Sequence, residues 1–325
     1  MILVNFGGPR VLSEIPEFMT ELLSDQDLIR TNWPRFVHKW LFSYIAKKRA
    51  EKVRSDYEKI GGGSPIFRDT EAIASLLREK LSCPVIPFHR YLKATHKSSL
   101  KKIEECQEPI LRVIPMFPQF SFATTGSIAR FFSEHLSRKK LATLRWVASY
   151  PTHLAFINSY YRRICEFLTA HNIEEKEIAI LFSCHGVPLS FIEEGDIYED
   201  ECNRSFQALS QRLPQAISKL SYQSKFGSEK WLEPSTEEMC QTFATWSEGR
   251  RSALIVPLSF TSDHIETLFE IEELYLPLLR KQGFFAGRCA ALNLAPDWIF
   301  ALQEIAKIES LVSNENLIRK NFLAF

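Results

Sequence analysis

Short apolar runs alternate with longer amphipathic stretches along the whole of this 325-residue chain. Eight apolar runs have the length of buried strands, at residues 2–6, 83–88, 110–116, 142–149, 178–183, 218–223, 253–258 and 286–292. Apolar positions that recur every three to four residues predict helices at 12–30, 35–58, 67–81, 125–137, 152–171, 204–213, 235–248, 264–282 and 296–312. This alternation of strands and helices predicts an α/β fold whose parallel sheets carry helices on both faces.

One motif occurs twice, at the start of the chain and near its middle. Residues 2–9 (Ile-Leu-Val-Asn-Phe-Gly-Gly-Pro) and 178–188 (Ile-Ala-Ile-Leu-Phe-Ser-Cys-His-Gly-Val-Pro) are both apolar runs that end in Gly-x-Pro. Aligning the two motifs matches Phe6 with His185. In parallel sheets, ligands bind at the carboxyl ends of the strands, where these two residues fall. We therefore expect a central cleft with Phe6 on one wall and His185, a titratable base, on the other.

The eight predicted strands divide into four and four, and the second set opens at this repeat. Each set is followed by a helix that proline begins, at Pro151 and Pro296. The sequence thus predicts two Rossmann-like lobes, each a four-stranded parallel sheet flanked by helices, at residues 1–150 and 151–295. The remainder, 296–325, is expected to form a terminal helix that crosses back onto the first lobe.

Composition excludes several classes of protein. The chain is 45% hydrophobic and 24% charged with a net charge of +1, which gives no reason to expect a nucleic-acid partner. No apolar run reaches the ~18 residues of a membrane-spanning helix, and no basic signal-peptide region opens the sequence. The seven cysteines form no C-x-x-C pair, so neither a zinc site nor a disulfide framework is favoured. Cysteines of this kind are typical of a reducing compartment, so we expect a cytoplasmic protein.

Carboxylates recur along one of the predicted helices. Glu266, Glu270 and Glu273 follow one another at spacings of four and three, so they share a stripe of an α-helix. Such carboxylates repel one another unless a cation or protons are shared among them. At ~100° per residue, His264 lies far around the helix from Glu266, so either His264 belongs to the preceding turn or the helix is locally widened. A capping box between Asp263 and Glu266, or a solvated acidic face, is the alternative.

Seven motifs occur in a fixed order between residues 4 and 268. They are Val4-Asn-Phe-Gly-Gly-Pro9, Ile60-Gly-Gly-Gly-Ser-Pro65, Arg90-Tyr91, Pro118-Gln119 with Thr124-Thr-Gly-Ser127, Phe182-Ser-Cys-His-Gly-Val-Pro188, Tyr222-Gln-Ser-Lys-Phe-Gly227 with Trp231, and Phe260-Thr-Ser-Asp-His-Ile-Glu-Thr-Leu268. Together they resemble the ferrochelatases, and the resemblance covers nearly the whole chain. It implies a lyase of haem biosynthesis that inserts Fe²⁺ into a porphyrin with loss of two pyrrole protons.

The resemblance also implies roles for the polar residues singled out above. Metal insertion needs a base near neutrality, and histidine, with an ordinary pKa of ~6.5, suits that task. Catalysis is assigned to His185 and Glu266, and metal handling to His185, Glu266 and Glu270. A core or capping histidine is the alternative for His185.

The remaining candidates would hold the porphyrin. Aromatic rings offer flat surfaces for stacking, while arginine and helix amino termini suit the propionate groups. The predicted porphyrin contacts are Phe6, Tyr57, Arg90, Tyr91, Ser127, Trp231 and His264. The glycines at 61–63 either cradle an anionic group or form a plain tight turn.

Partners and cofactors follow from the same reading. Because the metal is a substrate, no tightly bound cofactor is expected, and with no cysteine after Cys289 no [2Fe–2S] cluster is expected. An aromatic helix with a basic end at 33–49 predicts a peripheral membrane or pathway-enzyme contact, an ordinary packed helix being the alternative. We expect a monomer whose partners are porphyrin and ferrous iron. A non-catalytic tetrapyrrole carrier and a cobalt or nickel chelatase are alternatives, and the choice between protoporphyrin IX and coproporphyrin III stays open.

Overall fold

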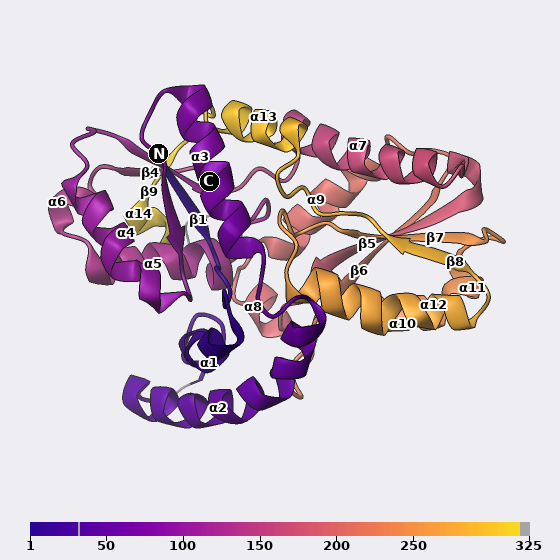
Figure 1. Cartoon of the computed structure of the whole chain (residues 1–325), viewed down its shortest axis with the longest axis horizontal. Coiled ribbons are helices and arrows are strands. Elements are labelled where there is room, and N and C mark those ends of the chain that lie inside the picture. Colours follow the sequence, from indigo (N-terminus) through magenta and orange to yellow (C-terminus); the bar gives the residue numbers. More distant parts are fainter. Residues whose placement is uncertain (32, 319–325) are drawn as a thin grey trace. The chain divides into compact units, whose positions relative to one another are not determined.

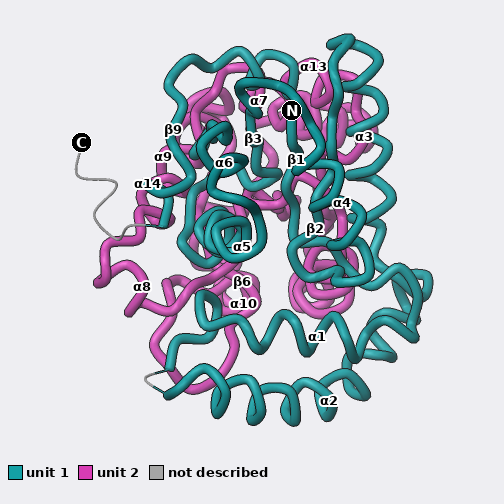
Figure 2. The backbone as a smooth tube through the Cα atoms, turned by 90° about the vertical axis from the view of Figure 1, so that its left-hand side faces the viewer, with its two compact units in different colours: residues 1–149, 302–325 teal, residues 150–301 magenta. Residues whose placement is uncertain are grey.

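The computed structural model describes residues 1–31 and 33–318, which form two compact units. The first unit joins residues 1–149 to the chain from residue 302 on, and the second comprises residues 150–301 (Figure 2). The last part of the predicted terminal segment, residues 319–325, lies outside the described residues.

The first unit is built on a five-stranded sheet in the order β2-β1-β3-β4-β9. Four strands run parallel: β1 (Ile2–Asn5), β2 (Ile86–His89), β3 (Leu111–Pro115) and β4 (Leu144–Trp146). All residues of β1 and β2 are buried, as expected for strands covered by helices on both faces.

The fifth strand, β9 (Val312–Ser313), departs from the predicted four-stranded sheet. It pairs antiparallel with β4 at the sheet edge. The neighbouring Asn314 fixes it there, because its side chain accepts from Trp146 Nε1 at 3.0 Å and donates to the Ala129 carbonyl at 3.0 Å. A two-residue strand is too short to show an alternation of apolar and polar residues, so the sequence could not predict it. Its pairing depends on contacts with residues distant in sequence.

The helices of the first unit follow the predicted pattern in part. They are α1 (Ile15–Leu23), α2 (Arg35–Lys59), α3 (Ile66–Leu81), α4 (Lys93–Glu105), α5 (Ser127–His135), α6 (Arg138–Leu141) and α14 (Asn314–Ile318), with the short turns η1 (Leu12–Glu14) and η2 (Phe122–Gly126). The predicted helix 12–30 ends early, at Leu23. Helix α4 was not predicted, because its sequence is mostly polar and buries only His96, Ser99 and Ile103.

The second unit contains a four-stranded parallel sheet in the order β6-β5-β7-β8. Its strands are β5 (Ile178–His185), β6 (Ile217–Gln223), β7 (Ser252–Pro257) and β8 (Phe285–Arg288). Strand β5 lies between β6 and β7 and is buried up to its last residue, His185 (Figure 1). The α/β class and the parallel sheets agree with the prediction.

Helices cover both faces of this second sheet (Figure 1). They are α7 (Leu154–Ala170), η3 (Glu175–Glu177), α8 (Leu189–Glu193), α9 (Tyr198–Ser210), α10 (Thr236–Gln241), α11 (Phe243–Trp246), η4 (Glu266–Tyr275), α12 (Leu276–Lys281) and α13 (Pro296–Ile305). One core layer joins Leu181 and Ile255 of the sheet to Ile271, Leu276 and Leu279. This layer fixes η4 against the sheet, close to the end of β5. No helix in the described part of the chain combines the length and apolar character that a bilayer crossing needs.

Candidate active site

His185 lies at the carboxyl end of β5, where the buried strand meets a turn. Its backbone N–H donates to Ser259 Oγ at 2.9 Å, and its Nδ1 donates to the Gly186 carbonyl. Because a carbonyl oxygen only accepts, Nδ1 carries a proton, and Nε2 is the nitrogen that gains or loses the second one. The side chain is 36% exposed. These contacts hold the imidazole in one orientation with a partly accessible, exchangeable nitrogen.

Element η4 is a π-helix, and His264 precedes it. The sequence analysis gave two ways in which His264 and Glu266 could come together: His264 lies in the turn before the helix, or the helix is locally widened. Both are observed. His264 Nε2 lies 3.3 Å from Glu266 Oε2, and His185 Nε2 lies 3.5 Å from Glu266 Oε1. Each oxygen of one carboxylate thus faces one imidazole. The alternative capping box is not formed, since no side chain caps the start of η4.

Glu270 follows Glu266 by four residues in η4 and lies among polar side chains at the end of β6. Its Oε2 accepts hydrogen bonds from Ser224 Oγ at 2.6 Å, Gln223 Nε2 at 3.3 Å and Tyr275 Oη at 3.4 Å. A half-buried carboxylate with three donors on one oxygen is held firmly in place. Glu270 therefore belongs to the same polar group as Glu266 and His185.

Glu273, the third member of the predicted stripe, is exposed instead. The prediction assumed an α-helix, in which positions seven apart share a face. A π-helix has more than four residues per turn, so seven residues span about one and a half turns. The helix type therefore separates Glu273 from Glu266, and the three-residue stripe was wrong at this position.

The electrostatics of the group differ from those of isolated side chains. Burial alone would lower the pKa of His185, but attraction and hydrogen bonding to Glu266 outweigh it and raise the pKa to about 9. Burial disfavours the charged form of Glu266, yet the two neighbouring imidazoles hold its pKa well below the usual range. For Glu270, burial and then repulsion from Glu266 raise the pKa to about 7, against its hydrogen bonds. Glu270, rather than His185, is thus the group that titrates near neutrality.

We expect Glu270→Gln to raise the melting temperature at pH 8 by a few degrees and to change it little at pH 5. A carboxyl group whose pKa is raised on folding contributes stability that is complete below its ordinary pKa and is lost as pH rises through about 7. Glutamine carries no charge, so it escapes this loss. Thermal unfolding at the two pH values measures the effect. Glu273→Gln is the exposed control, and an equal change at both pH values would contradict the assignment.

Aromatic side chains surround His185. The ring centroids of Trp231 and Phe260 lie 6.4 and 6.2 Å from that of the imidazole, and Phe260 also contacts His264 at 4.8 Å. A Cβ at Gly186 would lie 3.1 Å from Trp231 Cε3, so glycine permits this close approach. Trp231 and His264, two predicted porphyrin contacts, are thus brought to the same place as His185.

Three predicted propionate ligands in the first unit also meet, but on a residue that the sequence did not single out. Asp25 Oδ2 accepts from Arg90 Nη2 at 2.7 Å, Tyr91 Oη at 2.8 Å and Ser127 Oγ at 2.6 Å. Tyr91 and Ser127 are each 1% exposed. In this conformation the donors serve Asp25, so their contact with a propionate stays a prediction that requires Asp25 to release them. The sequence signal that could have drawn attention to Asp25 was the polar pair Ser24-Asp25 inside the predicted helix 12–30.

The other two predicted contacts in this unit differ in accessibility. Phe6 follows β1, is partly exposed, and packs against Tyr91 and Phe117 with ring centroids 5.1 Å apart in each case. Tyr57 is only 3% exposed and offers almost no surface for stacking. Phe6 and His185 belong to different units, and their placement on opposite walls of one cleft stays a prediction.

The glycine run at 61–63 forms a tight turn after α2. The N–H groups of Gly61, Gly62 and Ser64 donate to backbone carbonyls at 2.7–3.2 Å. Gly61 and Gly62 adopt φ of 101° and 86°, which favours glycine. A Cβ at Gly63 would lie 2.3 Å from a backbone oxygen. Of the two readings, the turn is the one observed, because the donors that would cradle an anion are already bonded.

Within residues 1–31 and 33–318, no three His, Cys, Asp or Glu side chains are arranged to hold a metal ion. His185, Glu266 and Glu270 form an ion pair and a hydrogen-bonded carboxylate rather than a ready coordination shell. The arrangement can exchange protons and offer negative charge to a passing cation.

Comparisons with known proteins show what the chain is similar to. A family model described as Ferrochelatase matches residues 1–310. The ferrochelatase of Chlamydia abortus is 44% identical over 318 residues, 98% of each chain, and that of Chlamydia pneumoniae is 42% identical over 98% of this chain and 95% of its own.

Two solved structures share the fold. CbiX, described as the terminal enzyme of sirohaem biosynthesis in denitrifying bacteria, superposes with a TM-score of 0.51 over 75% of this chain and 93% of its own, at 14% identity. A multi-domain Deinococcus radiodurans protein similar to chelatases gives 0.52 over 76% and 52%, at 12% identity. At these identities the likeness supports a chelatase-like fold alone.

Proposed function

The chain belongs to the ferrochelatase family, lyases that insert Fe²⁺ into a porphyrin to form haem, and we propose that His185, Glu266 and Glu270 carry out its proton chemistry. The observation that carries this proposal is the Glu266 carboxylate between two imidazoles, 3.5 Å from His185 and 3.3 Å from His264. Porphyrin and ferrous iron are the two substrates. The individual roles below are our inference from this geometry.

The charges at neutral pH suggest how metal arrival and proton removal are coupled. With a pKa of about 9, His185 holds a proton that its attraction to Glu266 stabilises. An Fe²⁺ ion that approaches the carboxylates competes with that proton for the same negative charge and lowers the pKa of His185. Nε2 then releases its proton to solvent and, once unprotonated, can accept a pyrrole proton. His185 would thus become a base when Fe²⁺ lies close to the carboxylates.

Glu270 provides a second acceptor. Its pKa of about 7 leaves it partly ionised at neutral pH, so it can take up a proton and release it again. Glu266 keeps its charge throughout and orients His185. Two exchangeable groups at one site match the two protons that metal insertion releases.

The aromatic residues suit a flat apolar substrate. We place the porphyrin against Trp231, with His264 beside the reacting group. A contact with Phe6, which belongs to the other unit, stays the prediction made from the sequence. Anaerobic insertion of Fe²⁺, followed by absorbance with protoporphyrin IX and coproporphyrin III side by side, tests the activity and the choice of substrate together. Binding of either porphyrin without insertion would favour a carrier, and faster insertion of Co²⁺ or Ni²⁺ would favour another chelatase.

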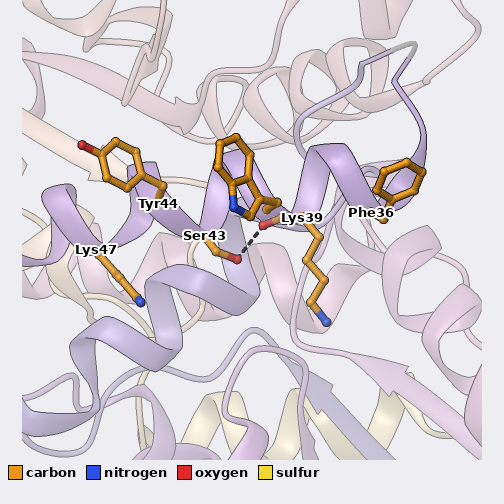
Figure 3. A pocket seen from close by; sticks show the side chains of 6 residues that line it. Phe36, Lys39, Ser43, Tyr44 and Lys47 are labelled. Atoms are coloured by element: carbon orange, nitrogen blue, oxygen red, sulfur yellow. Dashed lines mark hydrogen bonds between the residues drawn. The ribbon is translucent and has the colours of Figure 1, made fainter.

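An exposed aromatic stripe on α2 supports a contact with an anionic membrane surface. Phe36, Trp40 and Tyr44 recur at spacings of four and are 76%, 74% and 56% exposed. Together with Lys39 and Lys47 they line a shallow depression of about 460 Å³ (Figure 3). Aromatic and lysine side chains on one helix are typical of helices that lie in the membrane interface. The alternative of an ordinary packed helix would have these rings buried.

We expect Trp40→Ser to weaken sedimentation with vesicles that contain phosphatidylserine. The indole adds apolar area to the membrane contact while neighbouring lysines supply the attraction. Leu154→Ser is the control, because Leu154 is 63% exposed elsewhere on the surface. Equal losses in the two variants, or equal binding to uncharged vesicles, would contradict this surface.

A further inference from the structure

Arg288, at the end of β8, joins two carboxylates that flank the active-site residues of η4. Its Nη1 donates to Asp263 Oδ1 at 2.7 Å and its Nε donates to Glu272 Oε1 at 3.0 Å. The Arg288 and Asp263 side chains are 12% and 13% exposed. Asp263 precedes His264, and Glu272 lies well inside the π-helix. One planar guanidinium therefore connects the turn before the helix to its body.

Asp263 passes this constraint to the backbone of His264. Thr267 Oγ1 donates to Asp263 Oδ1 at 2.8 Å and accepts from the His264 N–H at 3.0 Å. Asn293 holds the other side, because its Nδ2 donates to Asp263 Oδ2 at 2.8 Å and its Oδ1 accepts from the Asp263 N–H at 2.7 Å. Both carboxylate oxygens of Asp263 are thus bonded, and these bonds restrict movement of the turn.

The π-helix needs such support. Helices of this type are rare and short, and they occur mostly where function requires a widened turn. In a regular α-helix His264 and Glu266 would point apart, whereas here their side chains are 3.3 Å from one another. A fork that holds Asp263 and Glu272 at a fixed separation opposes relaxation of this segment.

We propose that Arg288 is a positioning residue for iron insertion, acting through Asp263 and Thr267 to keep His264 and Glu266 aligned. The proposal rests on the function assigned above to the His185–Glu266 pair. Arg288 itself touches neither reacting group among the contacts described. Its effect is carried by the turn and the π-helix that its side chain joins.

The test compares Arg288→Met with Arg288→Lys, using anaerobic Fe²⁺ insertion, porphyrin affinity by fluorescence quenching, and melting temperature. We expect Arg288→Met to lower kcat by on the order of 10–100-fold, because small displacements of reacting groups have effects of this size. The KM for porphyrin should stay within about twofold of wild type. Lysine keeps the charge without the fork, so Arg288→Lys should restore only part of kcat.

Two further variants separate positioning from general stability. Arg280→Met is the control, since Arg280 lies in the same unit and donates only to the Ala286 carbonyl among its described bonds. Thr267→Val removes the link to His264 and leaves Arg288 in place, and should also lower kcat. It decides the question should Arg288→Met not fold.

A kcat within twofold of wild type in Arg288→Met or Thr267→Val, or an equal fall in Arg280→Met, would overturn the positioning role. His185→Ala, measured in parallel, distinguishes this outcome from failure of the proposed site. If His185→Ala is inactive while Arg288→Met is fully active, only the positioning role falls. If His185→Ala keeps its turnover, the proposed site falls and the positioning role with it.

Discussion

His185→Ala should lower the turnover of iron insertion by roughly 10²–10⁴-fold, the usual contribution of a positioned acid–base group. The variant removes the exchangeable Nε2 and leaves the strand intact, since the hydrogen bond to Ser259 comes from the backbone N–H. Porphyrin affinity should change little, because in the proposed site aromatic rings rather than the imidazole would provide most of the contact area.

The measurement is steady-state insertion of Fe²⁺ under anaerobic conditions, with porphyrin binding followed separately by fluorescence. Phe6→Ala is the comparison, because Phe6 supplies apolar surface and no titratable group. The activity of this variant should fall less than that of His185→Ala. Near-normal turnover in His185→Ala would remove His185 from the mechanism. It would leave membership of the family untouched, because that rests on the sequence of the whole chain.

The sheets were predictable from the sequence because their strands are buried. Continuous apolar runs mark β1 and β5, and all eight predicted strands are present, with ends that differ from the prediction by up to four residues. Helix α4 and strand β9 were not predicted, for two different reasons. The first is polar on most of its surface, and the second is too short to show a pattern. Local periodicity finds elements that bury a face and fails for those that tertiary contacts hold.

The site was predictable in part for a similar reason. On an α-helix His264 and Glu266 would point in different directions around the axis, which indicated that this segment is not a regular α-helix. The structure has a π-helix there. The same argument failed for Glu273, which was placed by α-helical spacing. Asp25 and Arg288 escaped notice because their importance comes from partners far along the chain.

Glu266→Gln should lower the turnover of iron insertion by on the order of 10²-fold and shift its pH dependence. The amide keeps the shape of the side chain but removes the charge that stabilises protonated His185. Burial then dominates, and the pKa of His185 falls below about 9. Since only unprotonated Nε2 can accept a proton, the rising limb of activity that belongs to His185 should move to lower pH even though the maximum is smaller.

The measurement is kcat for Fe²⁺ insertion across pH 6 to 9.5, in wild type and variant. Glu273→Gln is the matched control, because it removes a carboxylate from the same helix at an exposed position. If the charge of Glu266 acts on His185, only Glu266→Gln shifts the rising limb of the pH–kcat profile to lower pH. An equal loss in Glu273→Gln would instead point to a general weakening of η4. A lower rate with an unmoved limb would mean that Glu266 acts on the metal alone and that the proton on His185 is set by other groups.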